Sequence, residues 1–379
     1  MWQTQVQVDL GAIRDNVRHL RQGTTAEVMA VVKGDAYGHG IVPAARAAIA
    51  GGATWLGVAT LDEALTLRQA GITTPLLAWL IVPGMPLEQA IAADVDLSVA
   101  TPAQVDEAVE AARRVHRPAR LHLKVDTGLG RGGAAIADWP AVVERVAKAQ
   151  ADGSVEAVGV WSHLARADQP EHPTNADQIQ AFRQAVAIAA RSGINPRYRH
   201  LSNSAAAMAL PEAHFDLVRP GIAVYGLNPL TSRPSRKVRV SPDELRPAMT
   251  LRARVLLVKR VPAGHGVSYG HAYRTKRATT LAVVPLGYAD GIPRAASGSG
   301  PLLLNGRRYR IAGRVCMDQF VVDVGDVPVQ AGDIVTLFGP GDDGEPTADE
   351  WAELLGTINY EIVTRIGQRV PRVYVGEAS

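Results

Sequence analysis

Short, β-branched segments alternate with alanine-rich helical segments between about residues 28 and 225, and no other feature limits the possible folds as strongly. Near-continuous apolar strands separated by helices indicate parallel βα units. The expected strands cover residues 28–33, 55–60, 75–80, 96–100, 120–126, 155–163, 197–202 and 216–220. Two of the intervening helices are expected at residues 101–115 and 175–193. Eight units in roughly 200 residues fit a closed (β/α)8 barrel, and an open doubly wound sheet is the alternative.

The pattern changes beyond residue 240, where helical periodicity nearly disappears. Alternating segments punctuated by glycine, proline and aspartate follow, and they predict a separate all-β domain. Candidate strands cover residues 249–261, 278–288, 307–315, 320–327 and 333–339. We therefore expect an α/β chain in which a (β/α)8 TIM-type barrel at residues 9–240 precedes a C-terminal β domain at residues 241–379. Residues 1–8 are a candidate added strand of the β domain, because polar and apolar positions alternate there.

Composition and charge narrow the possible partners. The formal net charge is only +3 and the chain has no dense run of lysine and arginine, which argues against a nucleic-acid partner. The single cysteine, Cys316, cannot form an internal disulfide and suits a reducing compartment. The first residues lack the pattern of a secretory signal, and no apolar run approaches the ~20 residues that cross a bilayer. We therefore expect a cytoplasmic protein with no membrane partner, and we expect no metal.

Lys33 stands at the end of the first expected strand, where the glycine-rich segment AVVKGDAYGHG begins to turn. Catalytic residues of barrel enzymes cluster at the C-terminal ends of the strands. Desolvation there would lower the pKa of a lysine and make it a nucleophile that can form a Schiff base. The structural alternative is a lysine that extends its ammonium group from a strand end into water.

Other strand ends carry further polar residues. They are Lys124, Asp126, Arg131, His163, residues 202–204 and Arg219. Convergent polar groups indicate a lined pocket, and the cations among them indicate an anionic ligand. The loops after the seventh and eighth strands, which commonly bind phosphate in barrels, contain SNSAA and RPGIAVYG here. The residues alone therefore predict a barrel enzyme that binds a phosphorylated ligand beside a lysine.

Nine segments, in chain order, resemble the landmarks of the alanine racemase family. They are AVVKGDAYGHG, HLKVDTGLGR, WSHLARAD, HLSNSA, DLVRPGIAVYG, GVSYG, PLGYADG, GRVCMDQ and NYEIVTR. Together they span residues 30–365, nearly the whole chain. The resemblance implies an isomerase that interconverts L-alanine and D-alanine on pyridoxal 5'-phosphate, bound as an aldimine. It also implies a head-to-tail homodimer with shared active sites, which supplies D-alanine for peptidoglycan.

The same resemblance implies the catalytic residues. Lys33 would carry the cofactor and move a proton on the D face of the substrate. Tyr269, from the partner subunit, would move a proton on the L face. His163 would bond Tyr269, and Arg219 would bond both His163 and the pyridine nitrogen of the cofactor.

The remaining implied roles concern binding. Arg131 would contact the cofactor and approach the substrate carboxylate, which Met317, also from the partner subunit, would bind through its backbone. Lys124 would carry a carbamate that orients Arg131, and Tyr288 with Tyr360 would narrow the entrance. The implied cofactor-binding set is Lys33, Tyr37, Arg131, His163, Asn203, Ser204, Arg219, Gly221, Ile222 and Tyr360.

Taken singly, several of these residues also have ordinary structural interpretations. Tyr269 alone could be an exposed strand aromatic, His163 a core histidine, and Lys124 the partner of a nearby acid. We interpret His39 and His122 as structural. The proposed sites therefore depend on the resemblance much more than on spacing.

Three other functions share parts of this pattern. A barrel-type amino-acid decarboxylase would use a cysteine of its β domain, such as Cys316, but Arg219 argues against it because a decarboxylase gains from an acid that keeps the cofactor ring protonated. A non-enzymatic cofactor-binding barrel would lack residues 241–379. Serine and broad-specificity racemases share most of the motifs, and the entrance framed by Tyr288 and Tyr360 is the feature that suits alanine.

Overall fold

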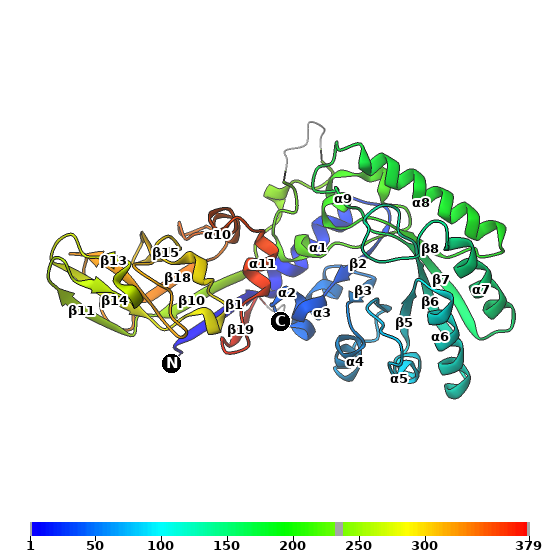
Figure 1. The fold of residues 1–379 in the computed structure, drawn as a ribbon, viewed down its shortest axis with the longest axis horizontal. Helices are drawn as coiled ribbons and strands as arrows, with labels where there is room; N and C mark the ends of the chain where they lie inside the picture. The colour runs from blue at the N-terminus through cyan, green and yellow to red at the C-terminus, as the bar shows by residue number, and fades with distance from the viewer. Residues whose placement is uncertain (1, 232–237, 377–379) are drawn as a thin grey trace. The chain divides into compact units, whose positions relative to one another are not determined.

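The computed structural model describes residues 2–231 and 238–376 (Figure 1), which form two compact units. The first, here called the barrel unit, comprises residues 13–36 and 41–245 apart from the six that are not described. The second, here called the β unit, comprises residues 2–12, 37–40 and 246–376. The domain limits expected from the sequence, 9–240 and 241–379, stay a prediction.

An eight-stranded parallel sheet forms the centre of the barrel unit, in the order β8-β7-β6-β5-β4-β3-β2-β9. Its strands are β2 (Glu27–Val31), β3 (Trp55–Val58), β4 (Leu76–Ala78), β5 (Val95–Val99), β6 (Ala119–Lys124), β7 (Val155–Trp161), β8 (Tyr198–His200) and β9 (Leu217–Val218). Backbone bonds from Asp216 to Arg199 and from Arg219 to Ser202, both 3.0 Å, join β8 to β9 and close the sheet. The closed sheet confirms the expected barrel and excludes the alternative of an open doubly wound sheet.

Helices alternate with these strands and lie around them (Figure 1). They are α1 (Leu10–Gln22), α2 (Lys33–Tyr37), α3 (Ile41–Ala50), α4 (Leu61–Gln69), α5 (Leu87–Ala92), α6 (Pro102–Val115), α7 (Trp139–Ala151), α8 (Thr174–Arg191) and α9 (Ser204–Ala209). The short α2 differs from the rest, because residues 34–36 have left-handed backbone instead of α-helical backbone. A local signal explains where α6 begins, because Thr101 caps its N-terminus and accepts a bond from Gln104 N–H. The expected helices at 101–115 and 175–193 correspond to α6 and α8.

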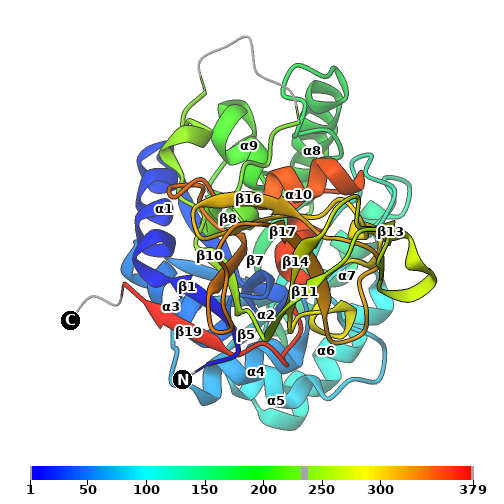
Figure 2. The same cartoon turned by 90° about the vertical axis from the view of Figure 1, so that its left-hand side faces the viewer.

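The β unit contains a six-stranded sheet, a three-stranded sheet and a two-stranded ribbon, in the orders β16-β15-β18-β10-β1-β19, β11-β14-β17 and β12-β13. The strands are β1 (Thr4–Asp9), β10 (Met249–Arg254), β11 (Leu257–Val261), β12 (Gly266–Val267), β13 (Tyr273–Arg274), β14 (Thr279–Val284), β15 (Pro301–Leu304), β16 (Arg307–Arg310), β17 (Phe320–Gly325), β18 (Ile334–Phe338) and β19 (Arg372–Val375). The N-terminal strand β1 pairs antiparallel with β10 and parallel with β19 (Figure 2), a partnership that the sequence left open.

Two features of the β unit differ from the sequence-based expectations. The expected single strand at 249–261 is divided into β10 and β11, which belong to different sheets. The division occurs where Val255 N–H bonds Asp333 and Leu256 N–H bonds Val283, so successive residues face different partners. In addition, the unit contains two helices, α10 (Ala348–Leu355) and α11 (Asn359–Thr364), that the sequence texture did not indicate.

No helix in the described ranges 2–231 and 238–376 combines the length and the apolar character that crossing a bilayer requires.

Candidate active site

Lys33 follows β2 and opens a turn of left-handed backbone. Gly34, Asp35, Ala36 and Tyr37 have φ angles of 62°, 52°, 54° and 54°. For residues other than glycine this conformation costs roughly 1–2 kcal/mol each. Glu63 holds the beginning of the turn, because its carboxylate accepts a 2.6 Å bond from Gly34 N–H. Strain of this kind is concentrated at functional sites in proteins.

The Lys33 side chain is half-buried, and its Nζ lies 5.8 Å from the centre of the Trp79 ring. Burial lowers the pKa of the Lys33 amine, the positive charge of Arg131 lowers it further, and Glu63 opposes the shift. A lowered pKa increases the fraction of neutral amine near neutral pH, which is the nucleophilic form. Lys33 is therefore prepared to attack a carbonyl group.

Trp161 lies beneath two further cations of the barrel unit. Lys124 Nζ is 4.4 Å from the centre of the Trp161 ring and Arg219 Cζ is 4.9 Å from it. The indole donates a 3.0 Å bond to Ser98 Oγ, which fixes the ring. Burial, followed by the charges of Arg219 and Arg131, lowers the pKa of Lys124 to about 8. The aromatic face stabilises cations that have little water around them.

Arg219 is buried, and its hydrogen-bond acceptors within the described ranges 2–231 and 238–376 are backbone carbonyls and histidine rings. Its Nη2 donates to the carbonyls of Ser162 at 2.7 Å and Leu201 at 3.2 Å, and it lies 3.4 Å from His163 Nδ1. Its Nη1 lies 3.2 Å from His200 Nδ1. Burial lowers the pKa of Arg219 to about 9. Because a guanidinium cannot accept a hydrogen bond, both histidines present an unprotonated Nδ1 to it.

His163 follows β7 and is kept neutral by its surroundings. Burial holds its pKa well below 6.5, and the positive charges of Arg219 and Arg131 add to the effect. With Nδ1 facing Arg219, the proton of the neutral ring is on Nε2. His163 therefore offers one N–H donor to a partner other than Arg219.

Backbone and hydroxyl donors converge where β8 and β9 end. Ser204 Oγ accepts a bond from Gly221 N–H at 2.7 Å and lies 3.4 Å from Ala223 N. Ile222 begins a short 3-10 helix directly after Gly221. Asn203 caps α9, and its side-chain oxygen accepts a bond from Ala206 N–H. Converging N–H groups and a small hydroxyl form the donor set that phosphate groups prefer.

Five of the site residues that the resemblance implies lie in the β unit, namely Tyr37, Tyr269, Tyr288, Met317 and Tyr360. Tyr37 is buried, with its ring centre 6.2 Å from that of Tyr360, and burial raises its pKa. Tyr269 starts the 3-10 helix Tyr269–His271 between β12 and β13 and is 72% exposed. The residue before it, Ser268, has a φ of 61° and donates a 2.6 Å bond to the carbonyl of Arg314.

Met317 and Tyr288 lie on hydrogen-bonded neighbouring segments of the β unit. Tyr288 N–H bonds the carbonyl of Cys316, and Ala289 N–H bonds that of Met317, both at 3.0 Å. Gly287 permits this approach, because a Cβ there would lie 2.2 Å from the Met317 carbonyl oxygen. The Met317 and Tyr288 side chains are 54% and 44% exposed.

Comparison with known proteins decides the family. The family model for the N-terminal domain of alanine racemase matches residues 8–229, and the model for its C-terminal domain matches residues 248–374. The chain belongs to the alanine racemase family. It is accordingly a pyridoxal-phosphate-dependent isomerase that interconverts L-alanine and D-alanine.

Individual relatives cover the whole length of the chain. The alanine racemase of Salinispora tropica is 64% identical over 378 residues, which is 100% of both proteins. The crystal structure of the alanine racemase from Streptomyces lavendulae has a TM-score of 0.95 and 53% identity, and the match covers 100% of this chain and 98% of that one. The alanine racemase of Bacillus anthracis, solved with bound L-Ala-P, has a TM-score of 0.89 and 39% identity, with 100% and 96% covered.

The residues of the barrel unit fit the family's cofactor. Pyridoxal phosphate carries an aldehyde, a phosphate and a pyridine ring. The Lys33 amine, whose pKa is lowered, suits the aldehyde. Ser204 suits the phosphate, because its oxygen accepts from the N–H groups of Gly221 and Ala223 and its hydroxyl proton is left to donate. The buried Arg219 guanidinium suits an unprotonated ring nitrogen.

Sequence reasoning missed several residues around this site. The sequence alone does not point to Trp79 or Trp161, although Trp161 stands two residues before His163 in the segment WSHLARAD. His200 was not named, and His122 was interpreted as structural only. His122 precedes Lys124 by two residues on β6, and this period-2 spacing places both side chains on the same face of the strand.

Proposed function

We propose that racemisation uses two bases, Lys33 on the D face and Tyr269 on the L face. The observation that supports this proposal most directly is the partly desolvated Lys33 amine beside a set of cations and phosphate-type donors. When bound, the cofactor supplies an electron sink for the charge that develops at Cα of the substrate. Racemisation removes a proton from one face and returns one to the other, so two bases are simpler than one that crosses the substrate plane.

Tyr269 needs help to act as a base, since an isolated tyrosine has a pKa of about 10. In our proposal the Nε2–H of His163 donates to the phenolic oxygen and stabilises its ionised form. Arg219 supports this arrangement, because its position 3.4 Å from His163 Nδ1 places the histidine proton on Nε2.

Arg131 and Lys124 complete the proposed substrate and cofactor contacts. Arg131 approaches the substrate carboxylate, as does the backbone of Met317. The neutral Lys124 amine adds to carbon dioxide, forming an N–C bond and releasing a proton, and the resulting carbamate orients Arg131. The lowered pKa of Lys124, about 8, and the neighbouring charges of Arg219 and Arg131 support this modification. A 13C-carbamate NMR signal absent from a Lys124→Gln variant tests it.

We further propose a cytoplasmic homodimer whose active sites each use residues of both subunits. Tyr269 and Met317 are exposed on the β unit, which supports their use by a partner. Tyr288 and Tyr360 frame the entrance, while Tyr37, Asn203 and Ile222 join the cofactor-binding set. The small entrance favours alanine, and serine turnover is the alternative, since a pocket discriminates against one added hydroxyl by only about a hundredfold. The product serves peptidoglycan synthesis, with no nucleic-acid or membrane partner.

Isotope exchange in heavy water tests the two-base assignment. The Tyr269→Phe variant should exchange the α-proton of D-alanine, through Lys33, while exchange from L-alanine and net racemisation fall by a factor of 100 or more, within the usual range of general-base catalysis. Lys33→Ala should abolish both exchanges, and L-serine measured beside L-alanine reports specificity. Equal loss of exchange from both enantiomers in Tyr269→Phe would show that Tyr269 does not serve one face alone.

A further inference from the structure

We propose that Asp96, His122 and His200 form a directed hydrogen-bond relay through the barrel interior that positions Arg219. The links are 3.1 Å from His122 Nε2 to Asp96 Oδ2, 2.9 Å from His122 Nδ1 to His200 Nε2, and 3.2 Å from His200 Nδ1 to Arg219 Nη1. The four residues come from β5, β6, β8 and the segment after β9. The inference rests on the proposed function, in which Arg219 keeps the His163 proton on Nε2, and on the fit of Arg219 to the ring nitrogen of the cofactor.

Arg219 sets the direction of every proton in this relay. Its guanidinium only donates, so His200 Nδ1 accepts and the proton of the neutral His200 ring is on Nε2. That proton faces His122 Nδ1, which therefore accepts in turn. His122 consequently carries its proton on Nε2 and donates it to the Asp96 carboxylate. The hydrogen bonds all point from Arg219 to Asp96, with no position left for a reversed ring.

Burial gives the relay its importance. Arg219 is 4% exposed, Asp96 is 2% exposed, and the two histidines are fully buried. Among residues 2–231 and 238–376, no carboxylate forms an ion pair with Arg219. The Asp96 carboxylate, which Arg219 reaches through two imidazoles, is therefore the acidic end of its hydrogen-bond chain. Within such a chain, the hydrogen bonds polarise and strengthen one another in the low-dielectric interior.

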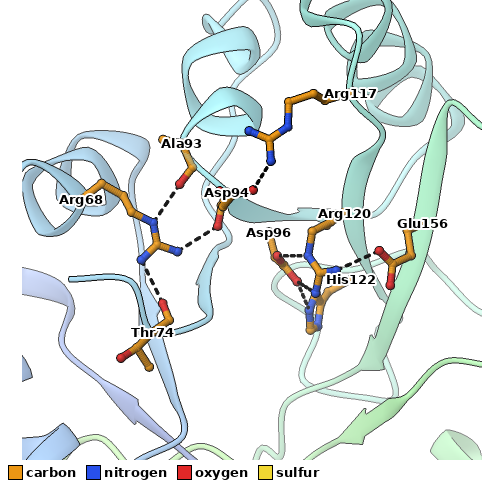
Figure 3. Close-up of polar contacts among 9 residues, drawn as sticks. All are labelled: Arg68, Thr74, Ala93, Asp94, Asp96, Arg117, Arg120, His122 and Glu156. Carbon is orange, nitrogen blue, oxygen red and sulfur yellow. Dashed lines mark hydrogen bonds and ion pairs between the residues drawn. The ribbon is translucent and has the colours of Figure 1, made fainter. Parts of the chain in front are cut away.

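Arg120 fixes the acidic end of the relay (Figure 3). Its Nε donates to Asp96 Oδ1 at 2.8 Å, and its Nη1 donates to Glu156 at 2.8 Å. Arg120 Nη2 also lies 3.4 Å from Asp96 Oδ2, the oxygen that His122 contacts, so Asp96 Oδ1 is bound by Arg120 alone and Oδ2 is shared by Arg120 and His122. Glu156 binds the same arginine but has no link to His122, so it offers a matched control.

The barrel interior is shaped to hold both imidazole rings. Gly159 on β7 leaves room for His122, since a Cβ at residue 159 would lie 2.3 Å from His122 Nδ1. The His200 ring is stacked on Trp161, with centres 5.6 Å apart and an angle of 2° between the planes. The same Trp161 ring lies beneath Arg219. Stacking keeps His200 Nδ1 directed at the guanidinium.

Loss of the Asp96 charge has a specific consequence. Arg120 Nε only donates, so an amide at residue 96 would keep its oxygen towards Arg120 and turn its NH2 group towards His122 Nε2. His122 Nε2 would then have to accept, which favours the opposite tautomer of His122. Its Nδ1 would then donate to His200 Nε2, and the His200 proton would move to the nitrogen that faces Arg219. Two donors would oppose each other there, and Arg219 would leave its position.

The test combines 15N NMR of histidine-labelled holoenzyme with racemisation kinetics. In the unsubstituted enzyme, His122 and His200 should both show a protonated Nε2 and an unprotonated Nδ1. Asp96→Asn should change this pattern in both rings and lower kcat by about tenfold or more, as losses of supporting hydrogen bonds do at metal sites, while KM changes little. Glu156→Gln should leave the NMR pattern and kcat unchanged.

Gly159→Ala provides a second variant that keeps every ionisable group and should disturb the same two rings. It decides the question if Asp96→Asn does not fold. A protonated Nδ1 in the unsubstituted enzyme would overturn the relay, as would identical spectra with and without Asp96. Changed spectra with unchanged kcat would show that the relay does not position Arg219. The NMR result remains decisive for the relay even if the two-base assignment fails.

Discussion

At the scale of single residues, both proposed bases adjoin strained backbone. Residues 35–37 lie just after Lys33 with φ angles between 52° and 54°, and Ser268 precedes Tyr269 with a φ of 61°. Such conformations cost about 1–3 kcal/mol each and persist only where other contacts maintain them. Here the Glu63 carboxylate holds Gly34 N–H, and the Arg314 carbonyl holds the Ser268 hydroxyl. We infer that this strain fixes the positions of the two bases.

The buried histidines of the barrel predict a fold that is sensitive to acid. Burial first and Arg219 second hold the pKa of His200 well below 6.5, and the same causes act on His163. An unfolded histidine binds a proton near pH 6.5, so this contribution to stability is complete above that pH. The stability of the fold decreases as the pH falls from about 6.5 towards the pKa of the folded state. The total decrease is about 1.4 kcal/mol for each pH unit by which the folded pKa of a histidine lies below its unfolded pKa.

Urea unfolding at pH values of about 7.5 and 5.5 measures this contribution. The unsubstituted protein should lose stability at the lower pH, and His200→Asn should reduce the loss even though it lowers stability at both pH values. The same pH dependence in His200→Asn as in the unsubstituted protein would contradict the assignment.

At the scale of elements, the β12–β13 ribbon determines where Tyr269 lies. Val267 pairs with Tyr273 across the ribbon, and the Tyr273 hydroxyl donates a 2.7 Å bond to Asp323 on β17. Burial, with the Asp323 carboxylate as the second cause, raises the pKa of Tyr273 to about 12, so it stays a donor. The ribbon is thereby anchored to the neighbouring sheet.

Tyr273→Phe should therefore affect the reaction as well as the fold. Loss of this charge-assisted bond should cost roughly 1.5–3 kcal/mol of unfolding free energy and lower kcat severalfold, because Tyr269 is less well positioned. Tyr309→Phe in the same unit is the control. Among the described residues the Tyr309 hydroxyl has no hydrogen-bond partner, so its removal should cost little. Thermal unfolding and kcat are measured for both variants. Equal effects of Tyr273→Phe and Tyr309→Phe would contradict the proposal that the Tyr273 hydroxyl anchors the ribbon.

The elements that the sequence predicts well are those with local signals. Strand and helix positions of the barrel follow from apolar periodicity and from capping residues such as Thr101. The division of residues 249–261 between two sheets depends on Asp333 and Val283, which are far away in the sequence, and no local pattern reveals it. The glycine-rich turn after Lys33 was expected, but no local signal predicts that Ala36 and Tyr37 adopt left-handed backbone within it.

The candidate site was predicted unevenly for a similar reason. Strand-end positions and charge placed Lys33, Lys124 and Arg219 in one pocket, and the structure brings these cations together in the barrel unit. The Trp161 platform and the link from His122 to Arg219 depend on side chains of several strands meeting inside the barrel. These side chains meet because the sheet is closed. The sequence predicts the closed sheet but not the register of its strands, which decides which side chains face one another.

At the scale of the whole molecule, the proposed dimer explains the surface of the β unit. Tyr269 is 72% exposed and Met317 is 54% exposed, although both have proposed roles at a site around Lys33. Exposed large side chains with a chemical role suit an active site completed by a second copy of the chain. The central claim is therefore that Lys33 and Tyr269 of one active site belong to different subunits.

Subunit complementation tests this claim most directly. Lys33→Ala and Tyr269→Ala homodimers should each be inactive in L-alanine racemisation. After mixing, unfolding and refolding, half of the dimers should be heterodimers with one intact site each, so activity should return to about a quarter of the unsubstituted level. A mixture that contains verified heterodimers but shows no racemisation would contradict the claim, because both bases would then come from the same chain.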